Sequence, residues 1–191
     1  RPGAGVDPAF FDPCPSEASV FVGPAFEFDL TQSADQVCYD ENLVVFAPNT
    51  PISGEWFYQV QGTVNRVPLG EFFELNLVPN TLPSPGVYDI IFVTEDPILA
   101  GCIIEKQLEL IVFPIPVFEV VVLTQADDCA AANGSFEITM LADADEVRID
   151  ETGQTFTNVV SGDVLPVVTG LEPGVYSVVA TSDSGCEFLL P

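Results

Sequence analysis

The chain has 191 residues, 48% of them hydrophobic, and its 29 acidic side chains against 4 basic ones give a formal net charge of −25. Such a charge repels nucleic-acid phosphates and anionic membrane surfaces, and the apolar content excludes an intrinsically disordered acidic tail. Because histidine is absent and cations are scarce, the usual general base and most phosphate-binding groups are missing. We therefore expect a protein that is not an enzyme and binds no nucleic acid.

Short apolar segments bounded by Pro, Gly or Asn follow one another along the chain, as is typical of β-strands. In the first part of the sequence they cover residues 26–30, 43–46, 55–60, 71–78 and 103–113. No segment has a sustained helical period, and the longest apolar stretch, residues 111–123, is too short and too interrupted by proline to cross a bilayer. The pattern predicts an all-β protein of immunoglobulin-like Greek-key sandwiches with no membrane insertion.

Two segments of the chain repeat one another. Residues 85–102 read PGVYDIIFVTEDPILAGC, and residues 173–186 read PGVYSVVATSDSGC. In both, Pro-Gly predicts a turn, and the β-branched and aromatic residues that follow predict a strand. The repeat predicts an N-terminal extended segment at residues 1–23, a first domain at 24–115 and a second at 116–191. The short Pro-rich junction between the domains favours a semi-rigid, end-to-end arrangement.

The repeat also suggests how the five cysteines pair. Cys38 and Cys102 of the first copy correspond to Cys129 and Cys186 of the second, so we expect the bonds Cys38–Cys102 and Cys129–Cys186. Disulfides predict an oxidising compartment, with buried reduced thiols as the alternative. Cys14 is left without a counterpart among these pairs.

The N-terminal segment resembles the last strand of a preceding domain. Cys14 and the apolar run Val20-Phe21-Val22 precede Pro24 much as Cys102 and its strand precede Pro116, while few residues follow Cys186. Two explanations remain open. The chain is an excerpt of a longer tandem array, or it is a filament subunit whose N-terminal segment completes the second domain of the next copy by strand addition. The candidate self-assembly contacts are Phe10, Phe11, Cys14, Val20, Phe21 and Val22.

Two further features of the sequence are candidate binding sites. Acidic clusters at residues 127–128, 143–146 and 150–151 have no recognised calcium-loop spacing, so we expect a solvated acidic face and no cofactor, with calcium left open. Trp56, the only tryptophan, is either a platform for stacking sugars or a core residue packed on the Cys38–Cys102 disulfide. We expect the core position.

The second copy contains a series of motifs in a fixed order. Cys129 is followed by a small turn at Asn133-Gly134-Ser135, by the alternating residues 136–140, by Pro173-Gly-Val-Tyr176 and by Gly185-Cys186. This series resembles the SprB-type repeat of Bacteroidota surface adhesins. The Pro-Gly-x-Tyr hairpin also resembles polycystic-kidney-disease-like modules. The match covers residues 129–186, is looser in the first copy, and departs from the family's aromatic stretch at LADADEVRIDETGQ.

The resemblance implies a cell-surface or secreted protein that is exported by the type IX pathway and used in adhesion or gliding. Together with the repeat, it predicts a structural module of an extracellular filament or adhesin whose main partner is another copy of itself. The alternative is a carbohydrate-binding or spacer module of a secreted multidomain protein, with surface glycans as the partner.

Overall fold

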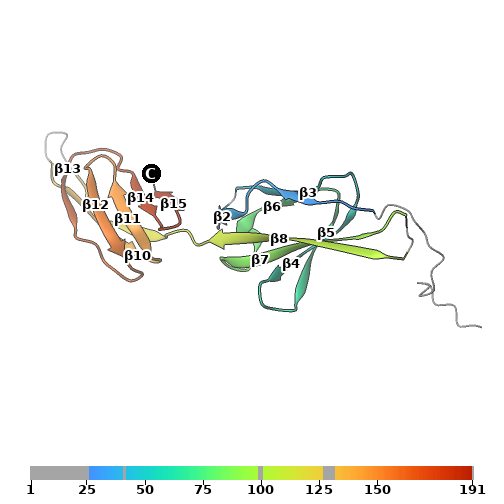
Figure 1. The fold of residues 1–191 in the computed structure, drawn as a ribbon. Coiled ribbons are helices and arrows are strands. Elements are labelled where there is room, and N and C mark those ends of the chain that lie inside the picture. Colours follow the sequence, from blue (N-terminus) through green and yellow to red (C-terminus); the bar gives the residue numbers. More distant parts are fainter. Residues whose placement is uncertain (1–25, 41, 99–100, 127–131, 191) are drawn as a thin grey trace, which may run out of the picture.

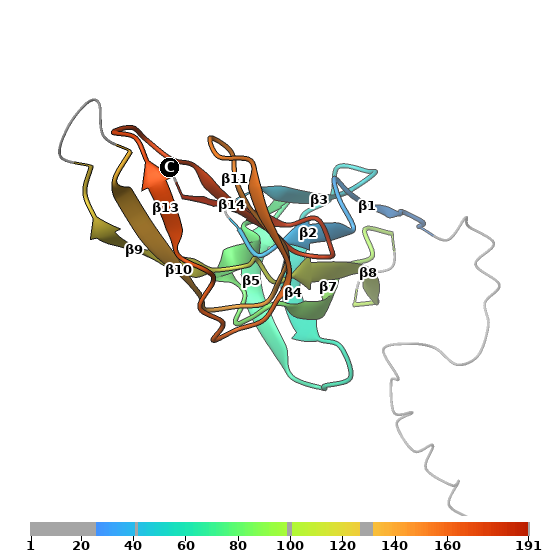
Figure 2. The same cartoon turned by 90° about the vertical axis from the view of Figure 1, so that its left-hand side faces the viewer.

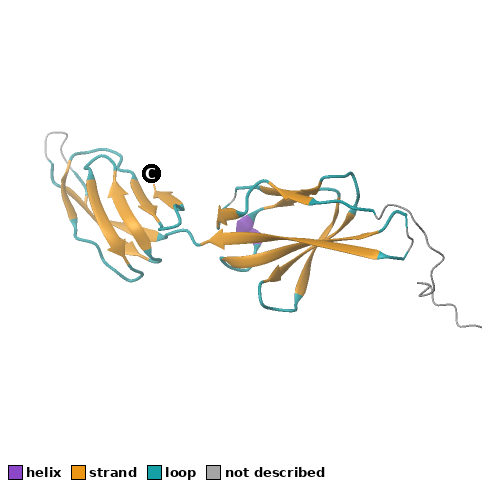
Figure 3. Cartoon of the chain, viewed as in Figure 1, coloured by secondary structure: helices purple, strands orange, loops and turns teal. Residues whose placement is uncertain are grey.

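The structure, a computed structural model, describes residues 26–40, 42–98, 101–126 and 132–190. Within these residues the regular elements are strands and one short 3-10 helix, and no helix is long and apolar enough to cross a membrane. The all-β prediction is confirmed (Figure 3). The elements are β1 (Leu30–Gln32), β2 (Gln36–Cys38), β3 (Val44–Pro48), β4 (Gly54–Val60), β5 (Arg66–Phe72), β6 (Leu75–Leu77), η1 (Pro79–Thr81), β7 (Gly86–Glu95), β8 (Ile103–Phe113), β9 (Phe118–Thr124), β10 (Gly134–Met140), β11 (Ala144–Ile149), β12 (Gln154–Val159), β13 (Val168–Leu171), β14 (Val178–Thr181) and β15 (Glu187–Leu190).

The strands up to Phe113 form two sheets, which we call the first half (residues 26–113). One sheet has the order β1-β3-β6 and the other β2-β8-β7-β4-β5. Pairing is antiparallel except between β2 and β8, which run parallel with Cys38 opposite Phe113. The sequence of the first half therefore builds both of its sheets from its own strands.

The strands from Phe118 onward form two further sheets, which we call the second half (residues 118–190). Their orders are β13-β10-β9 and β12-β11-β14-β15, and all of these pairs are antiparallel. In β10, Phe136, Ile138 and Met140 are buried while the residues between them are partly exposed. Alternation of this kind places every second side chain of a strand in the core.

Each half has a hydrophobic core of its own. The first is centred on Trp56, Phe46 and Phe92, and the second on Ile138, Met140 and Ile149. Figure 1 shows the two halves end to end, joined by the segment between β8 and β9, and in Figure 2, turned by 90°, the second half lies in front of the first. Since no sheet contains strands from both halves, the junction is held by other means.

Several strand predictions are confirmed and three are corrected. Strands at residues 43–46, 55–60 and 103–113 correspond to β3, β4 and β8. The strand expected at 26–30 instead forms at Leu30–Gln32, where it pairs with β3. Residues 71–78 divide between β5 and β6, since the chain crosses there from one sheet to the other. Gly134 and Ser135, expected in a turn, begin β10.

Candidate functional site

The junction between the halves carries two covalent connections. One is the segment of residues 114–117 between β8 and β9. The other is a disulfide between Cys38 and Cys186, whose Cα atoms are 5.6 Å apart and whose positions differ by 148 in sequence. A single flexible connection would let the halves rotate, whereas two connections side by side restrict both rotation and bending. The junction is the feature of this molecule that most constrains its shape.

The chain on either side of the disulfide is held by backbone hydrogen bonds. On the first half, the Tyr39 amide donates to the Phe113 carbonyl at 2.8 Å, which fixes the end of β2 to the end of β8. On the second half, the Cys186 amide donates to the Ser182 hydroxyl at 3.1 Å, and the Gly185 amide donates to the Ser182 carbonyl at 2.9 Å. Gly185 has a φ of 81°, a conformation that favours glycine, so this tight turn places Cys186 at the junction.

The predicted pair Cys38–Cys102 is wrong, because Cys38 is bonded to Cys186. The strands explain why. Cys102 precedes β8, whereas Cys38 lies opposite Phe113 at the other end of that strand. At about 3.3 Å per residue, the two cysteines are separated by about 35 Å along the strand, whereas bonded cysteines have Cα atoms within about 7 Å of each other. The pair Cys129–Cys186 is excluded by the same bond, and Cys129 itself lies outside the described residues.

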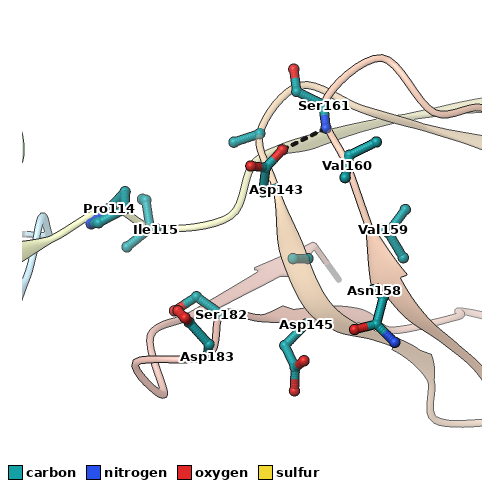
Figure 4. Close-up of a pocket in the computed structure, with 12 residues that line it drawn as sticks. Pro114, Ile115, Asp143, Asp145, Asn158, Val159, Val160, Ser161, Ser182 and Asp183 are labelled. Atoms are coloured by element: carbon teal, nitrogen blue, oxygen red, sulfur yellow. Dashed lines mark hydrogen bonds between the residues drawn. The ribbon is translucent and has the colours of Figure 1, made fainter.

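An open cavity of about 650 Å³ lies beside the junction on the second half. Figure 4 shows the Asp143 carboxylate pointing toward the Ser161 amide, from which it accepts a hydrogen bond of 2.7 Å. Asp145 and Asp183 add two further carboxylates to the lining. The cavity is lined by Pro114, Ile115, Ala142, Asp143, Ala144, Asp145, Asn158, Val159, Val160, Ser161, Ser182 and Asp183.

Some acidic residues of the second half are paired with the cation Arg148. Arg148 forms ion pairs with Asp150 at 2.6 Å and with Glu146 at 3.8 Å. The hydrogen bond to the Asp150 carboxylate, with its charge, raises the pKa of Arg148 above its ordinary value. Among the described residues no group of three or more His, Cys, Asp or Glu side chains is arranged to hold a metal ion. Calcium binding remains a prediction, and residues 127–128 lie outside the described part of the chain.

Trp56 is a core residue, as predicted, and its side chain is 0% exposed. Its ring lies 4.7 Å from that of Phe92 and 6.3 Å from that of Phe46, centroid to centroid. The indole N–H donates to the Phe72 carbonyl at 3.1 Å. The expected contact with a Cys38–Cys102 disulfide is wrong, because that disulfide does not form. With both ring faces buried, Trp56 offers no platform to a sugar.

The repeated Pro-Gly-Val-Tyr segment makes the same tyrosine hydrogen bond in both halves. The Tyr176 hydroxyl donates to the Glu172 carbonyl at 2.8 Å, and the Tyr88 hydroxyl donates to the Ser84 carbonyl, again four residues upstream. In each half the tyrosine precedes a cysteine that opens the next strand. The prediction that these are one structural element occurring twice is supported by this shared hydrogen bond.

The second half has two strands at the edges of its sheets, β9 and β15, that run in the same direction from the junction. Within the described residues β9 pairs only with β10, and β15 pairs only with β14. Three successive apolar residues of β9 are exposed, Val121 by 50%, Val122 by 61% and Leu123 by 50%. In the first half the strand that corresponds to β15 is β8, and its outer edge is covered by β2, which pairs with it in parallel.

A cavity of about 360 Å³ lies at the far end of this open edge. It is bordered by the end of β9, the beginning of β10 and the Pro-Gly-Val-Tyr turn, through Val122, Phe136 and Tyr176 among others. The cavity is partly apolar. The candidate self-assembly residues Phe10, Phe11, Cys14, Val20, Phe21 and Val22 lie outside the described residues.

Sequence reasoning missed the covalent connection across the junction. The length of the strand after Cys102 is the signal that could have suggested it. A strand of that length places Cys102 far from the proline-rich junction, whereas Cys38 lies at the junction end of the strand. No protein-family model matches the chain, and no curated protein sequence is significantly similar to it.

Proposed function

We propose that this chain is a non-enzymatic structural module of an extracellular filament or surface adhesin, built of two tandem immunoglobulin-like sandwiches. The observation that carries the proposal is the Cys38–Cys186 disulfide beside the 114–117 connection. A stalk or filament subunit works by holding its units in a fixed relation, and two covalent connections at one junction serve that purpose. Because disulfides persist in oxidising compartments, the bond also favours a location outside the cytoplasm.

The immunoglobulin-like assignment is supported by strand order. In the second half, β13-β10-β9 and β12-β11-β14-β15 correspond to an E-B-A sheet and a C′-C-F-G sheet. In the first half, the parallel pair β2–β8 is the pairing expected between the first and last strands of such a domain. The tyrosine hydrogen bonds of Tyr88 and Tyr176 match the tyrosine corner of immunoglobulin-like folds.

Assembly of copies by strand complementation is the form of polymerisation that we propose. The acceptor is the open edge between β9 and β15, with the 360 Å³ cavity at the end of β9. The donor is residues 14–22 of a second copy, whose apolar run Val20-Phe21-Val22 suits an added β-strand. The donor carries one acidic residue, Glu17, so it adds little to the repulsion between chains of net charge −25.

The experiment is electron microscopy and light scattering of the full chain in about 0.15 M salt, where exposed charges are screened beyond roughly 8 Å. We expect filaments whose formation is abolished by Val20→Glu with Val22→Glu, since both side chains would point to the acceptor. Gly3→Glu with Gly5→Glu, which adds the same two charges outside residues 14–22, is the matched control and should still polymerise. A full chain that stays monomeric at high concentration, with and without calcium, contradicts self-assembly.

The alternative, a carbohydrate-binding module, loses its strongest candidate residue because Trp56 is buried. A glycan array distinguishes the two readings. Selective binding to one glycan that survives Val20→Glu with Val22→Glu would favour the carbohydrate-binding module over the filament.

A further inference from the structure

We infer that the Cys38–Cys186 disulfide carries tension past both hydrophobic cores when the chain is pulled by its two ends. This mechanical role goes beyond the proposed function, and it holds whether or not copies assemble. The reasoning rests on the order of the residues along the covalent path, on where that path lies in the fold, and on the length of chain that the bond encloses.

The covalent path through the first half follows one edge of it. Residues 26–38 run toward the junction beside β8, as Figure 1 shows. Asp29 lies 3.9 Å from the Lys106 amine, the Asp35 carbonyl accepts from the Ile111 amide, and Cys38 lies opposite Phe113. At Cys38 the covalent path divides into two branches, one along the polypeptide and one through the disulfide. The disulfide leads directly to Cys186 and then into β15.

Everything between the two cysteines is therefore enclosed in a covalent loop. The loop contains β3 to β14, and with them nearly all of both cores, including Trp56, Ile138 and Met140. Tension that enters at residue 26 and leaves at residue 190 does not pass through the backbone of these strands. The 114–117 connection is also inside the loop, so it is not stretched while the disulfide is intact.

The strands outside the loop are the ones that bear the load. They are β1 and β2, which pair with β3 and β8, and β15, which pairs with β14 over four residues. Of these strands, β2 runs parallel to β8, which Figure 1 shows extending along the line that joins the two halves. Hydrogen bonds of antiparallel pairs are perpendicular to the strands, so pulling along the strands loads them together and not one by one.

The disulfide keeps a long segment of the chain from being extended. The 148 positions between the cysteines correspond to about 500 Å of extended chain, at about 3.5 Å per residue. Residues 26–38 and 186–190, which stay outside the loop, extend to only about 60 Å on the same scale. Intact and reduced molecules should thus differ almost tenfold in the fully extended length between residues 26 and 190.

Single-molecule force spectroscopy on the full chain, with handles at residues 1 and 191, tests the inference. Without reductant, we expect complete extension to stop about 500 Å short of the fully extended chain. Dithiothreitol added under constant force should release this length in a step whose rate rises with its concentration. An oxidised molecule that gains the full length without reductant would overturn the inference.

Two variants make the result specific. The chain with Cys14→Ser, Cys102→Ser and Cys129→Ser keeps only the two junction cysteines and should behave as the parent does, with and without dithiothreitol. Cys38→Ser with Cys186→Ser should extend fully without reductant. If the triple variant instead extends fully while oxidised, a disulfide other than Cys38–Cys186 limits the extension of the parent chain, and the inference fails. Because all readings come from single molecules, they do not depend on polymerisation.

Discussion

The Tyr176 hydroxyl donates a 2.8 Å hydrogen bond to the carbonyl of Glu172, four residues earlier, and Tyr88 makes the equivalent bond to Ser84. Each bond ties the beginning of a strand segment to the turn that precedes it. Although the two halves share few residues overall, this contact is retained in both. It links the repeated motif of the sequence to one local structure.

Removing either hydroxyl should destabilise the half that contains it. Tyr176→Phe and Tyr88→Phe each delete one hydrogen bond, which contributes about 1 kcal/mol to folding. Urea unfolding followed by circular dichroism measures the change. Tyr58→Phe is the matched control, since the Tyr58 hydroxyl makes no hydrogen bond within the described part of the chain. An equal loss in all three variants would show that the corner bond has no special role.

Removing the disulfide should lower stability more than any single contact does. The chain-entropy model gives about 5 kcal/mol as the upper contribution of a bond that closes a loop of 148 residues. We expect Cys38→Ser with Cys186→Ser to lower the guanidinium midpoint, and the wild-type chain in reductant to match it. Unchanged unfolding of the wild-type chain in reductant would argue against the bond.

Gly54 should not tolerate a side chain. A Cβ at this position would lie 2.5 Å from the Val93 carbonyl oxygen and 2.6 Å from the Phe92 ring, where β4 lies against β7. Gly54→Ala should therefore cost about 1–3 kcal/mol, the range for overpacking a core. Gly174→Ala is the control, because its nearest neighbour would be the Tyr176 ring at an ordinary 3.8 Å. Thermal unfolding of both variants tests the difference.

Acid should weaken one contact between β11 and β14. The Ser177 amide donates a 2.7 Å hydrogen bond to the Glu151 carboxylate and holds the pKa of that group below its ordinary value of 4.5. The pKa of Glu151 is lower in the folded chain than in the unfolded chain. The hydrogen bond therefore stabilises the fold at pH values above the unfolded-state pKa, and this stabilisation is lost as the pH falls through the folded-state pKa. Glu151→Gln should destabilise the chain at pH 7 and much less at pH 3.

The comparison needs a carboxylate that lacks such a bond. Glu137, in β10, has no hydrogen bond or ion pair among the described residues, so Glu137→Gln should show little difference between the two pH values. Guanidinium unfolding at each pH supplies the free energies. A loss for Glu151→Gln that does not change with pH would rule out the carboxylate as its source.

Local features of the sequence were enough to predict the strands and their repetition. Alternating apolar residues and β-branched runs bounded by turn residues correspond to β3, β4 and β8, and the Pro-Gly-Val-Tyr motif predicts the same element in both halves. These signals are local because a strand exposes and buries successive side chains by its own geometry. The core position of Trp56 is the one expected from the single inner-strand Trp of immunoglobulin-like sandwiches.

Only the tertiary structure decided which cysteines bond and where the chain changes sheets. Residues 71–78 read as one apolar run, yet β5 and β6 belong to different sheets because their partners, β4 and β3, do. Cys38 and Cys102 are matched by the repeat, yet strand β8 separates them and the arrangement of the halves brings Cys186 to Cys38 instead. A disulfide requires Cα atoms within about 7 Å, and that distance depends on how strands pair and how the halves meet, which spacing along the chain does not determine.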